Sequence, residues 1–286
     1  MNRFFAVFLI ICTFFNISCT HKSAPNNPLV IQPKDTRCFI TYKNLVYGQD
    51  STAQSMDLYL PMYVNKKSPI IILIHGGGWS SGNKDDFNNI GLDSFFTAHN
   101  CAVVTMNYRL VNSCPFSAEV DDIGLVIDYL KQKSIEWNID PNRICLFGRS
   151  SGAHLALLYA YTRNSDKNVK AVIDMFGPTN LADSSIIVTP LGINVTDMLG
   201  AFLSNSQAWH DDSPIFYTHS AVPTVILQGT NDSVVYPIQS EMLEDSLFAN
   251  KVPYLYLPWQ GNGHGWNKSR WLESRDVTMA WIQRFL

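Results

Sequence analysis

Apolar and polar positions follow two different periods along the chain. Strict alternation over residues 39–47 and 55–60 is typical of half-buried antiparallel strands. Later apolar runs are continuous and rich in β-branched residues, as in the strands of a parallel sheet covered on both faces. These runs predict buried strands at 70–74, 102–106, 144–147, 169–176, 222–227 and 252–257.

Segments with helical spacing of apolar residues lie between these runs. The predicted helices are at 86–99, 118–133, 153–161, 238–248 and 271–286. Strands that alternate with helices predict an α/β domain, in which a mostly parallel sheet carries helices on both faces. The leading antiparallel pair makes the sheet mixed. Residues 179–220 are too many for a simple connection and predict a small helical cap over a pocket.

The N-terminal segment is expected to direct export rather than to fold with the domain. Arg3 precedes an apolar run over 4–15, which is too short to span a membrane comfortably. Ser18 and Cys19 resemble the lipobox of bacterial lipoproteins, which predicts a signal peptide over 1–19 and lipidation of Cys19; ordinary signal cleavage is the alternative. Residues 20–37 are then a tether and 38–286 the catalytic domain. The expected location is periplasmic or at the cell surface for a lipoprotein, and otherwise secreted.

Charge and cysteine content narrow the function classes. The 286 residues carry a net charge of −3 and no basic run, which argues against a nucleic-acid partner. No C-x-x-C motif is present, and His210 and His219 have no metal-ligand spacing with a partner, so no metal site is expected. Cys101 and Cys145 lie in or beside predicted buried strands and are expected to pack as small apolar side chains. Export permits disulfides among the mature cysteines, but the sequence does not define a pairing.

The sequence Gly148-Arg149-Ser150-Ser151-Gly152 fits the pattern G-x-S-x-G between a predicted strand and a predicted helix. That context is typical of a nucleophile elbow, in which small residues permit a sharp turn and expose the central serine. The helix N-terminus behind the turn favours developing negative charge. Ser150 is therefore the candidate nucleophile, and a plain helix-capping serine is the alternative.

Two further polar residues follow later strands of the predicted sheet. Asp232 comes after the strand at 222–227, and His264 comes after the strand at 252–257. Carboxyl ends of parallel strands meet at one edge of the sheet, so these residues are expected beside Ser150. An imidazole can take the serine proton, and a carboxylate can orient that imidazole. The alternatives are a turn-forming Asp232 and a loop histidine at His264, while His154 is expected to pack on its helix.

A run of glycines at 75–79, His-Gly-Gly-Gly-Trp, follows the strand at 70–74. Consecutive glycines let backbone N–H groups turn toward an anion. The N–H groups of Gly77, Gly78 and Ser151 are the candidate oxyanion-hole donors, and His75 is expected to brace the loop. The alternatives are a flexible glycine turn or a phosphate loop, although the Gly-Lys-Ser/Thr ending of a P-loop is absent.

Taken together, these motifs resemble α/β-hydrolase esterases of the hormone-sensitive-lipase and BD-FAE-like type, the latter named for bifunctional feruloyl and acetyl xylan esterases. The resemblance runs from about residue 54 to the C-terminus. It implies an α/β-hydrolase fold and hydrolysis of carboxylic esters without a cofactor. The segments that carry it are at 56–61, 75–79, 107–110, 140–144, 148–156 and 229–232.

Two departures from the family pattern bear on the substrate. Arg149 stands where the family usually has an acidic or small residue, and Ser151-Gly152-Ala153 replaces the usual alanine and glycines. Trp79, Arg149 and Trp266 are the candidate substrate-binding residues. We expect a small-molecule or saccharide ester as substrate, with acetyl or feruloyl groups on plant polysaccharide as the first candidates. A short-chain lipase, an arylformamidase, a serine peptidase or a non-catalytic binding protein of this fold remain alternatives.

Overall fold

The computed structural model describes residues 29–32, 39–62, 64–88, 90–113, 115–187, 206–266 and 268–286. Its strands are β1 Leu29–Gln32, β2 Phe39–Val46, β3 Ser55–Pro61, β4 Ser68–Ile74, β5 Ala102–Met106, β6 Ile139–Arg149, β7 Val169–Met175, β8 Thr224–Gly229 and β9 Tyr254–Trp259. Its helices are η1 Lys84–Phe87, α1 Leu92–Ala98, α2 Ser117–Gln132, α3 Ser151–Thr162, α4 Ser184–Ile187, α6 Ser206–Asp211, η2 Pro214–Ser220, α7 Ile238–Ala249 and α8 Lys268–Phe285.

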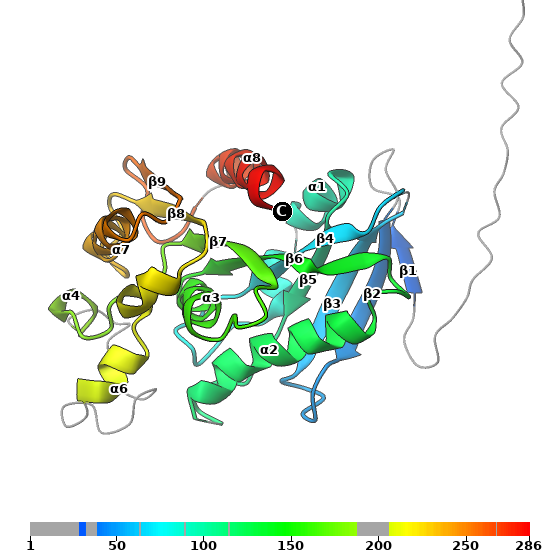
Figure 1. Cartoon of the computed structure of the whole chain (residues 1–286), viewed down its shortest axis with the longest axis horizontal. Coiled ribbons are helices and arrows are strands. Elements are labelled where there is room, and N and C mark those ends of the chain that lie inside the picture. The colour runs from blue at the N-terminus through cyan, green and yellow to red at the C-terminus, as the bar shows by residue number, and fades with distance from the viewer. Residues whose placement is uncertain are drawn as a thin grey trace, which may run out of the picture.

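A single nine-stranded sheet with the order β1-β2-β3-β5-β4-β6-β7-β8-β9 forms the centre of the molecule (Figure 1). The strand pairs β1–β2, β2–β3 and β3–β5 are antiparallel. All later pairs in this order, from β5–β4 to β8–β9, are parallel. The predicted α/β class with a mixed, mostly parallel sheet is confirmed. The carboxyl ends of β4, β6, β8 and β9 consequently lie at one edge of the sheet.

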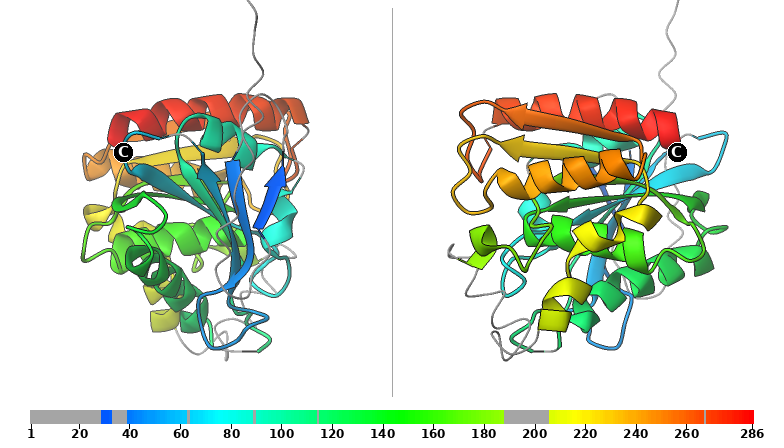
Figure 2. Two further views of the ribbon diagram at one scale, coloured as in Figure 1. Left: turned by 90° about the vertical axis from the view of Figure 1, so that its right-hand side faces the viewer. Right: turned by 60° about the vertical axis from the view of Figure 1, so that its left-hand side comes forward.

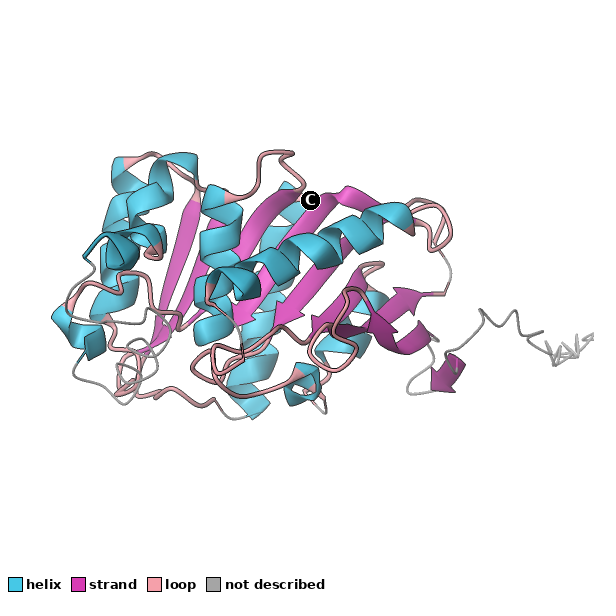
Figure 3. Cartoon of the chain, turned by 90° about the horizontal axis from the view of Figure 1, so that it is seen from below, coloured by secondary structure: helices cyan, strands magenta, loops and turns pink. Residues whose placement is uncertain are grey.

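Helices cover both faces of this sheet, as the sequence predicts. Helices α2, α3 and α7 pack on one face, and α1 and α8 pack on the other (Figures 2 and 3). The continuous apolar runs of β4 and β6 are buried because each strand is covered on both sides: Ile70, Ile72 and Leu146 contribute to one core, and Ile71, Leu73 and Phe147 contribute to the other.

Three predictions about segment boundaries are wrong. Residues 29–32 lie in the predicted tether, yet they form β1 and pair with β2. The predicted helix over 86–99 divides into η1 and α1, because Gly91 adopts a left-handed φ of 84° at the start of α1. The predicted turn at Asp140-Pro141-Asn142 belongs to the first residues of β6.

The predicted cap is described only in part. Helix α4, helix α6 and η2 lie within 179–220, whereas residues 188–205 are outside the described part of the chain. The predicted signal peptide, its lipidation site Cys19, and Cys38 and Cys114 are outside it as well. The thiols of Cys101 and Cys145 are free and buried. No helix within the described ranges is both long enough and apolar enough to cross a membrane.

Candidate functional site

Ser150 lies at a sharp turn between β6 and α3. Its φ of 55° and ψ of −126° are strained for a non-glycine residue, at a typical cost of about 1 to 3 kcal/mol. The turn is held by a hydrogen bond of 2.9 Å from the Ser150 N–H to the Met175 carbonyl. Only glycine fits at Gly148, since a Cβ there would lie 2.2 Å from the Gly152 carbonyl oxygen. The packing thus enforces the sharp turn predicted for the nucleophile elbow, and Ser150, only 7% exposed, lies at the floor of the pocket lining.

His264 connects Ser150 with Asp232. Its Nε2 lies 2.9 Å from the Ser150 Oγ, and its Nδ1 lies 2.8 Å from the Asp232 Oδ2. Because an ionised carboxylate only accepts hydrogen bonds, Nδ1 carries the proton and the Nε2 lone pair faces the hydroxyl. The ring of Phe176 packs 4.6 Å from the imidazole and limits its rotation. The three residues that the sequence singled out are therefore joined in one hydrogen-bonded chain.

Asp232 is held by a ring of donors. Its Oδ1 accepts the N–H groups of Val234 at 2.9 Å and Val235 at 3.0 Å. Its Oδ2 accepts the Gln228 amide at 3.3 Å besides His264. Ser240 donates to the Gln228 Oε1 at 2.9 Å and fixes that amide in turn. Hydrogen bonds to both oxygens fix the orientation of the carboxylate toward His264.

The loops that carry Asp232 and His264 are bonded to each other. The Asn231 N–H donates to the Asn262 carbonyl at 2.9 Å, and the Gly261 N–H donates to the Thr230 Oγ1 at 3.0 Å. At the end of β8, a Cβ on Gly229 would lie 2.2 Å from the Asn262 carbonyl oxygen. This close approach requires glycine, and it fixes the spacing between the acid and the imidazole.

The glycine loop after β4 lies against the elbow. A Cβ on Gly76 would meet the Arg149 carbonyl oxygen at 2.9 Å and the Ser150 Cβ at 3.1 Å. Gly77 and Gly78 have φ values of 127° and 59°, which side chains disfavour. Both line the pocket with Ser150, and Ser151 begins helix α3. The structure therefore brings Gly77, Gly78 and Ser151 close to Ser150, and their role as oxyanion donors stays a prediction.

His75 braces this loop from behind. Its ring stacks on Tyr108 with centroids 4.2 Å apart, and the Tyr108 hydroxyl donates to the His75 carbonyl at 3.0 Å. Burial lowers the pKa of His75 to about 4, partly offset by the carbonyl of Gly76. His75 is therefore a neutral structural residue at neutral pH.

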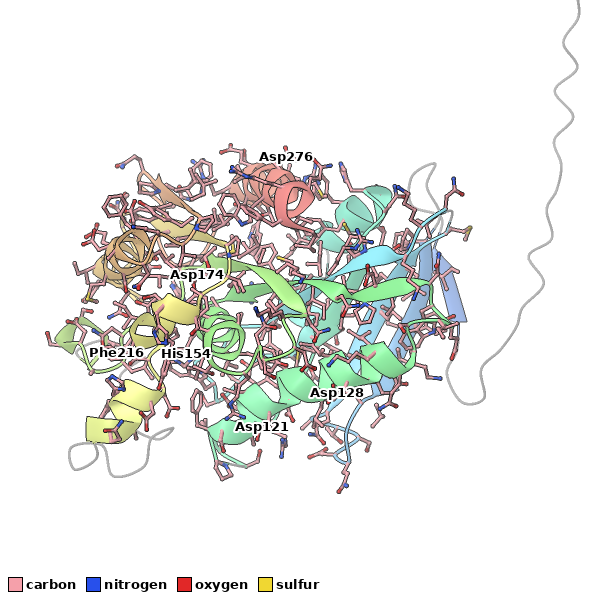
Figure 4. All side chains as sticks on the ribbon, in the orientation of Figure 1. Asp121, Asp128, His154, Asp174, Phe216 and Asp276 are labelled. Atoms are coloured by element: carbon pink, nitrogen blue, oxygen red, sulfur yellow. The ribbon has the colours of Figure 1, made fainter. Side chains whose placement is uncertain are left out.

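Trp79 does not line the pocket, so the prediction that it binds substrate is wrong. Its φ of 60° turns the indole inward, where the side chain is wholly buried. The indole Nε1–H donates to His154 Nδ1 at 3.2 Å, and His154 Nε2 donates to the Asp212 carbonyl at 2.7 Å. His154, labelled on α3 in Figure 4, thus ties the glycine loop to the predicted cap, which agrees with its expected packing role.

A pocket of about 520 Å³ opens above Ser150 and His264. The glycine loop and Arg149 form part of its lining, and Phe176, Trp266 and Trp271 supply an aromatic wall. The candidates Arg149 and Trp266 are therefore at the pocket, with Trp271 in place of Trp79. Among the described residues 179–187 and 206–220, none lines this pocket.

The sequence reading missed Gln228, Phe176 and Trp271. Gln228 directly precedes the Gly-Thr-Asn-Asp segment at the end of a strand, and this position could have indicated a contact with Asp232. Phe176 has a φ of 46° directly after β7, which brings its ring toward His264, and no local pattern indicates that turn. In the described part of the chain, no group of three or more His, Cys, Asp or Glu side chains is placed to hold a metal ion.

The sequence is similar to those of named esterases. Esterase LipC of Mycobacterium tuberculosis is 26% identical over 253 residues, which cover 81% of this chain and 61% of LipC. Carboxylesterase NlhH of the same organism is 27% identical over 180 residues, covering 61% of this chain and 55% of NlhH. The chain thus spans less than two thirds of either relative's length.

Solved structures show the same fold. A truncated carbohydrate esterase from gut microbiota superposes with a TM-score of 0.75 at 22% identity, covering 85% of this chain and 96% of that one. An inhibited esterase B from Lactobacillus rhamnosis superposes with a TM-score of 0.73 at 21% identity, covering 85% and 86%. The α/β-hydrolase fold is therefore established. Because the BD-FAE family model matches residues 56–247, well over half of the sequence, the chain belongs to the BD-FAE family.

Proposed function

We propose that this protein is a serine carboxylic-ester hydrolase in which Ser150 is the nucleophile, His264 the general base and acid, and Asp232 the residue that orients His264. The observation that carries the proposal is the position of His264, whose two nitrogens lie 2.9 Å from the serine hydroxyl and 2.8 Å from the carboxylate. The names of the esterase relatives support the same reaction class.

Acylation begins when the Ser150 Oγ attacks the ester carbonyl and its proton passes to His264 Nε2. The carbonyl oxygen becomes an oxyanion, which the N–H groups of Gly77, Gly78 and Ser151 stabilise. Loss of one such donor typically costs about 3 kcal/mol of transition-state stabilisation. Asp232 stabilises the imidazolium without taking its proton. The alcohol leaves with the proton from His264, and the acyl group remains on Ser150.

Deacylation repeats these steps with water. His264 takes a proton from the water, which attacks the acyl carbonyl, and then returns the proton to the Ser150 Oγ as the acid departs. The reaction needs no cofactor, because nucleophile, base and oxyanion donors all come from this chain.

The central test replaces Ser150 with alanine. Hydrolysis of p-nitrophenyl acetate is expected to fall to the uncatalysed background, with the same melting temperature or a higher one, since the turn loses no core contact. A fluorophosphonate probe should label Ser150 in the parent protein only. Unchanged turnover in Ser150→Ala, or absence of labelling, would reject the assignment and favour a non-catalytic binding protein.

For the substrate, we propose short-chain or aryl acyl esters such as acetyl or feruloyl groups on plant polysaccharide. The aromatic wall of Phe176, Trp266 and Trp271 suits stacking on a sugar or aryl ring. The family and the similar carbohydrate esterase support this class. A panel of acetylated xylo-oligosaccharide, methyl ferulate, medium-chain p-nitrophenyl esters, N-formylkynurenine and peptide amides distinguishes it from a lipase, an arylformamidase or a peptidase.

We further propose export and a lipid anchor at Cys19, on the sequence pattern of residues 1–19. Metabolic labelling with an alkynyl fatty acid in a bacterial host is expected to mark the full chain, and Cys19→Ser should abolish the label. Labelling that persists in Cys19→Ser, or a secreted unlabelled product of the parent chain, would reject the anchor.

A further inference from the structure

Arg149 lines the pocket directly beside the nucleophile in the chain. Its side chain is 26% exposed, and it shares the pocket lining with Ser150 and His264. Among the described residues of this lining, Arg149 supplies the sole permanent charge. Phe176, Trp266 and Trp271 form an uncharged wall of the same pocket. A substrate in this pocket therefore meets one fixed cation.

The Arg149 guanidinium has a long ion pair with Asp86 and, among the described residues, no hydrogen-bond acceptor. Its nearest carboxylate is Asp86 Oδ2, 3.7 Å from a terminal nitrogen and beyond hydrogen-bond distance. That same oxygen accepts the Asn83 N–H at 3.3 Å in the capping box of η1. The Phe87 ring lies 5.6 Å from the guanidinium carbon and accepts no conventional hydrogen bond.

Arg109 provides a comparison, because its guanidinium is hydrogen-bonded within the protein. Its Nε lies 3.0 Å and its Nη2 lies 2.7 Å from the Asp122 Oδ1, and Nη2 also donates to the Ala118 carbonyl at 3.2 Å. Its side chain is 30% exposed, close to the value for Arg149. At similar exposure, the Arg109 guanidinium has hydrogen-bond acceptors for Nε and Nη2, whereas no described residue accepts a hydrogen bond from the Arg149 guanidinium. Burial lowers the pKa of Arg149, so its charged form gains from an additional anionic partner.

We propose that Arg149 binds a carboxylate of the substrate, so that the enzyme prefers esters that carry an anionic carboxylate a few bonds from the scissile carbonyl. This inference rests on the proposed ester hydrolysis at Ser150. The planar fork of a guanidinium matches a carboxylate with two parallel hydrogen bonds. Since Arg149 and Ser150 line the same pocket, a carboxylate bound by Arg149 lies near the reacting ester. Half-esters of dicarboxylic acids and acylated acidic sugars or aryl acids belong to this class.

Two matched pairs of probes locate the carboxylate. On the acyl side, mono-4-nitrophenyl glutarate is compared with 4-nitrophenyl valerate. On the alcohol side, 4-acetoxybenzoate is compared with its methyl ester. The rate with Ser150→Ala is subtracted, which removes intramolecular catalysis by the probe itself. In at least one pair, kcat/KM is expected to be about tenfold or more higher for the anion, the typical gain from a charge-assisted pair. Raising the salt concentration should lower this preference.

Variants identify the residue responsible. Arg149→Met should reduce the ratio of anionic to neutral kcat/KM about tenfold or more, and Arg149→Lys should restore part of it as a point charge without the fork. Asp86→Asn removes the competing carboxylate and should raise the ratio severalfold. Equal rates for both members of both pairs, or a ratio unchanged in Arg149→Met and Asp86→Asn, would overturn the inference. If no ester is hydrolysed and Ser150 is not labelled by a fluorophosphonate, the proposed esterase function fails instead.

Discussion

Two histidines of this protein use both ring nitrogens, but their surroundings differ. His264 contacts a carboxylate and a hydroxyl, and its side chain is 22% exposed toward the pocket. His154 contacts an indole N–H and a backbone carbonyl, and it is wholly buried. Burial lowers the pKa of His154 to about 4. A carboxylate stabilises an imidazolium, whereas an indole donor requires the neutral ring.

The hydrogen-bond partners of each histidine decide its role more than its distance from the nucleophile in the sequence does. His154 is on the elbow helix, only four residues beyond Ser150, yet it has no hydrogen bond to that side chain. It connects α3, the Trp79 loop and the residue Asp212 of the insertion. His264 comes from the opposite end of the sequence and completes the chain of proton transfer. The following predictions test this division.

The largest effect is expected for His264→Gln. Without a base, kcat for p-nitrophenyl acetate should fall by about 10⁴-fold or more, as for other members of such triads. The free energy of unfolding should change by less than about 1 kcal/mol, because the residue is partly exposed and outside the core. Steady-state kinetics and urea denaturation measure both quantities. Substantial residual turnover would transfer the role of base to another group.

For His154→Ala we expect the opposite result, a large loss of stability and a small loss of turnover. The variant leaves the Trp79 N–H and the Asp212 carbonyl without partners and opens a cavity, at a cost of about 3 kcal/mol of stability. Turnover should fall only about tenfold, through looser placement of the glycine loop. His210→Ala is the control, since His210 is 50% exposed and stacks on Phe216, labelled in Figure 4. Equal stability of the two variants would contradict the bracing role.

The pH dependence of the free energy of unfolding should depend on the buried imidazole of His154. The pKa of His154 lies near 4 in the folded state and near 6.5 when exposed, so between these values the unfolded chain binds more protons. Stability should fall as pH decreases from 6.5 toward 4, by at most about 1.4 kcal/mol per pH unit for this group. His75 contributes in the same direction. Urea midpoints from pH 7 to 5 measure the slope, which should be shallower in His154→Gln.

The smallest effect is expected for Trp79→Phe, which keeps an aromatic ring but removes the donor to His154. A cost of about 1 kcal/mol is expected for this hydrogen bond, with a change in kcat of a few fold. Trp281→Phe is the matched control, because its indole nitrogen is buried and has no partner among the described residues. If both variants lose the same stability, the bond from Trp79 to His154 carries no net energy.

The sequence predicted the residues whose position follows from strand ends. Ser150, Asp232 and His264 each directly follow a strand or its loop, and a parallel sheet brings such ends together. The inward direction of Trp79 could not be predicted, because it depends on a left-handed φ that only the packed loop imposes. Glu119 is similar: on an amphipathic helix it resembles a solvated residue, yet it is wholly buried and burial raises its pKa to about 10.

The predicted segment boundaries were wrong where contacts between residues distant in the sequence determine the secondary structure. β1 follows Pro28 in a polar stretch, and its strand conformation comes from pairing with Phe39–Tyr42 of β2. The pattern of apolar and polar residues within 29–32 does not indicate which strand they pair with. Gly91 divides a helical pattern for a related reason, since only its φ of 84° in the folded chain shows that the two parts are separate.

The contact of Gly229 with the loop of Asn262 has a consequence for redesign. Because the acid loop and the histidine loop touch backbone to backbone, neither can be exchanged by itself for a loop of different shape. A graft from another hydrolase would have to transfer residues 228–232 and 259–266 together as one cassette. The two segments are distant in the sequence, but for engineering they behave as a single replaceable part.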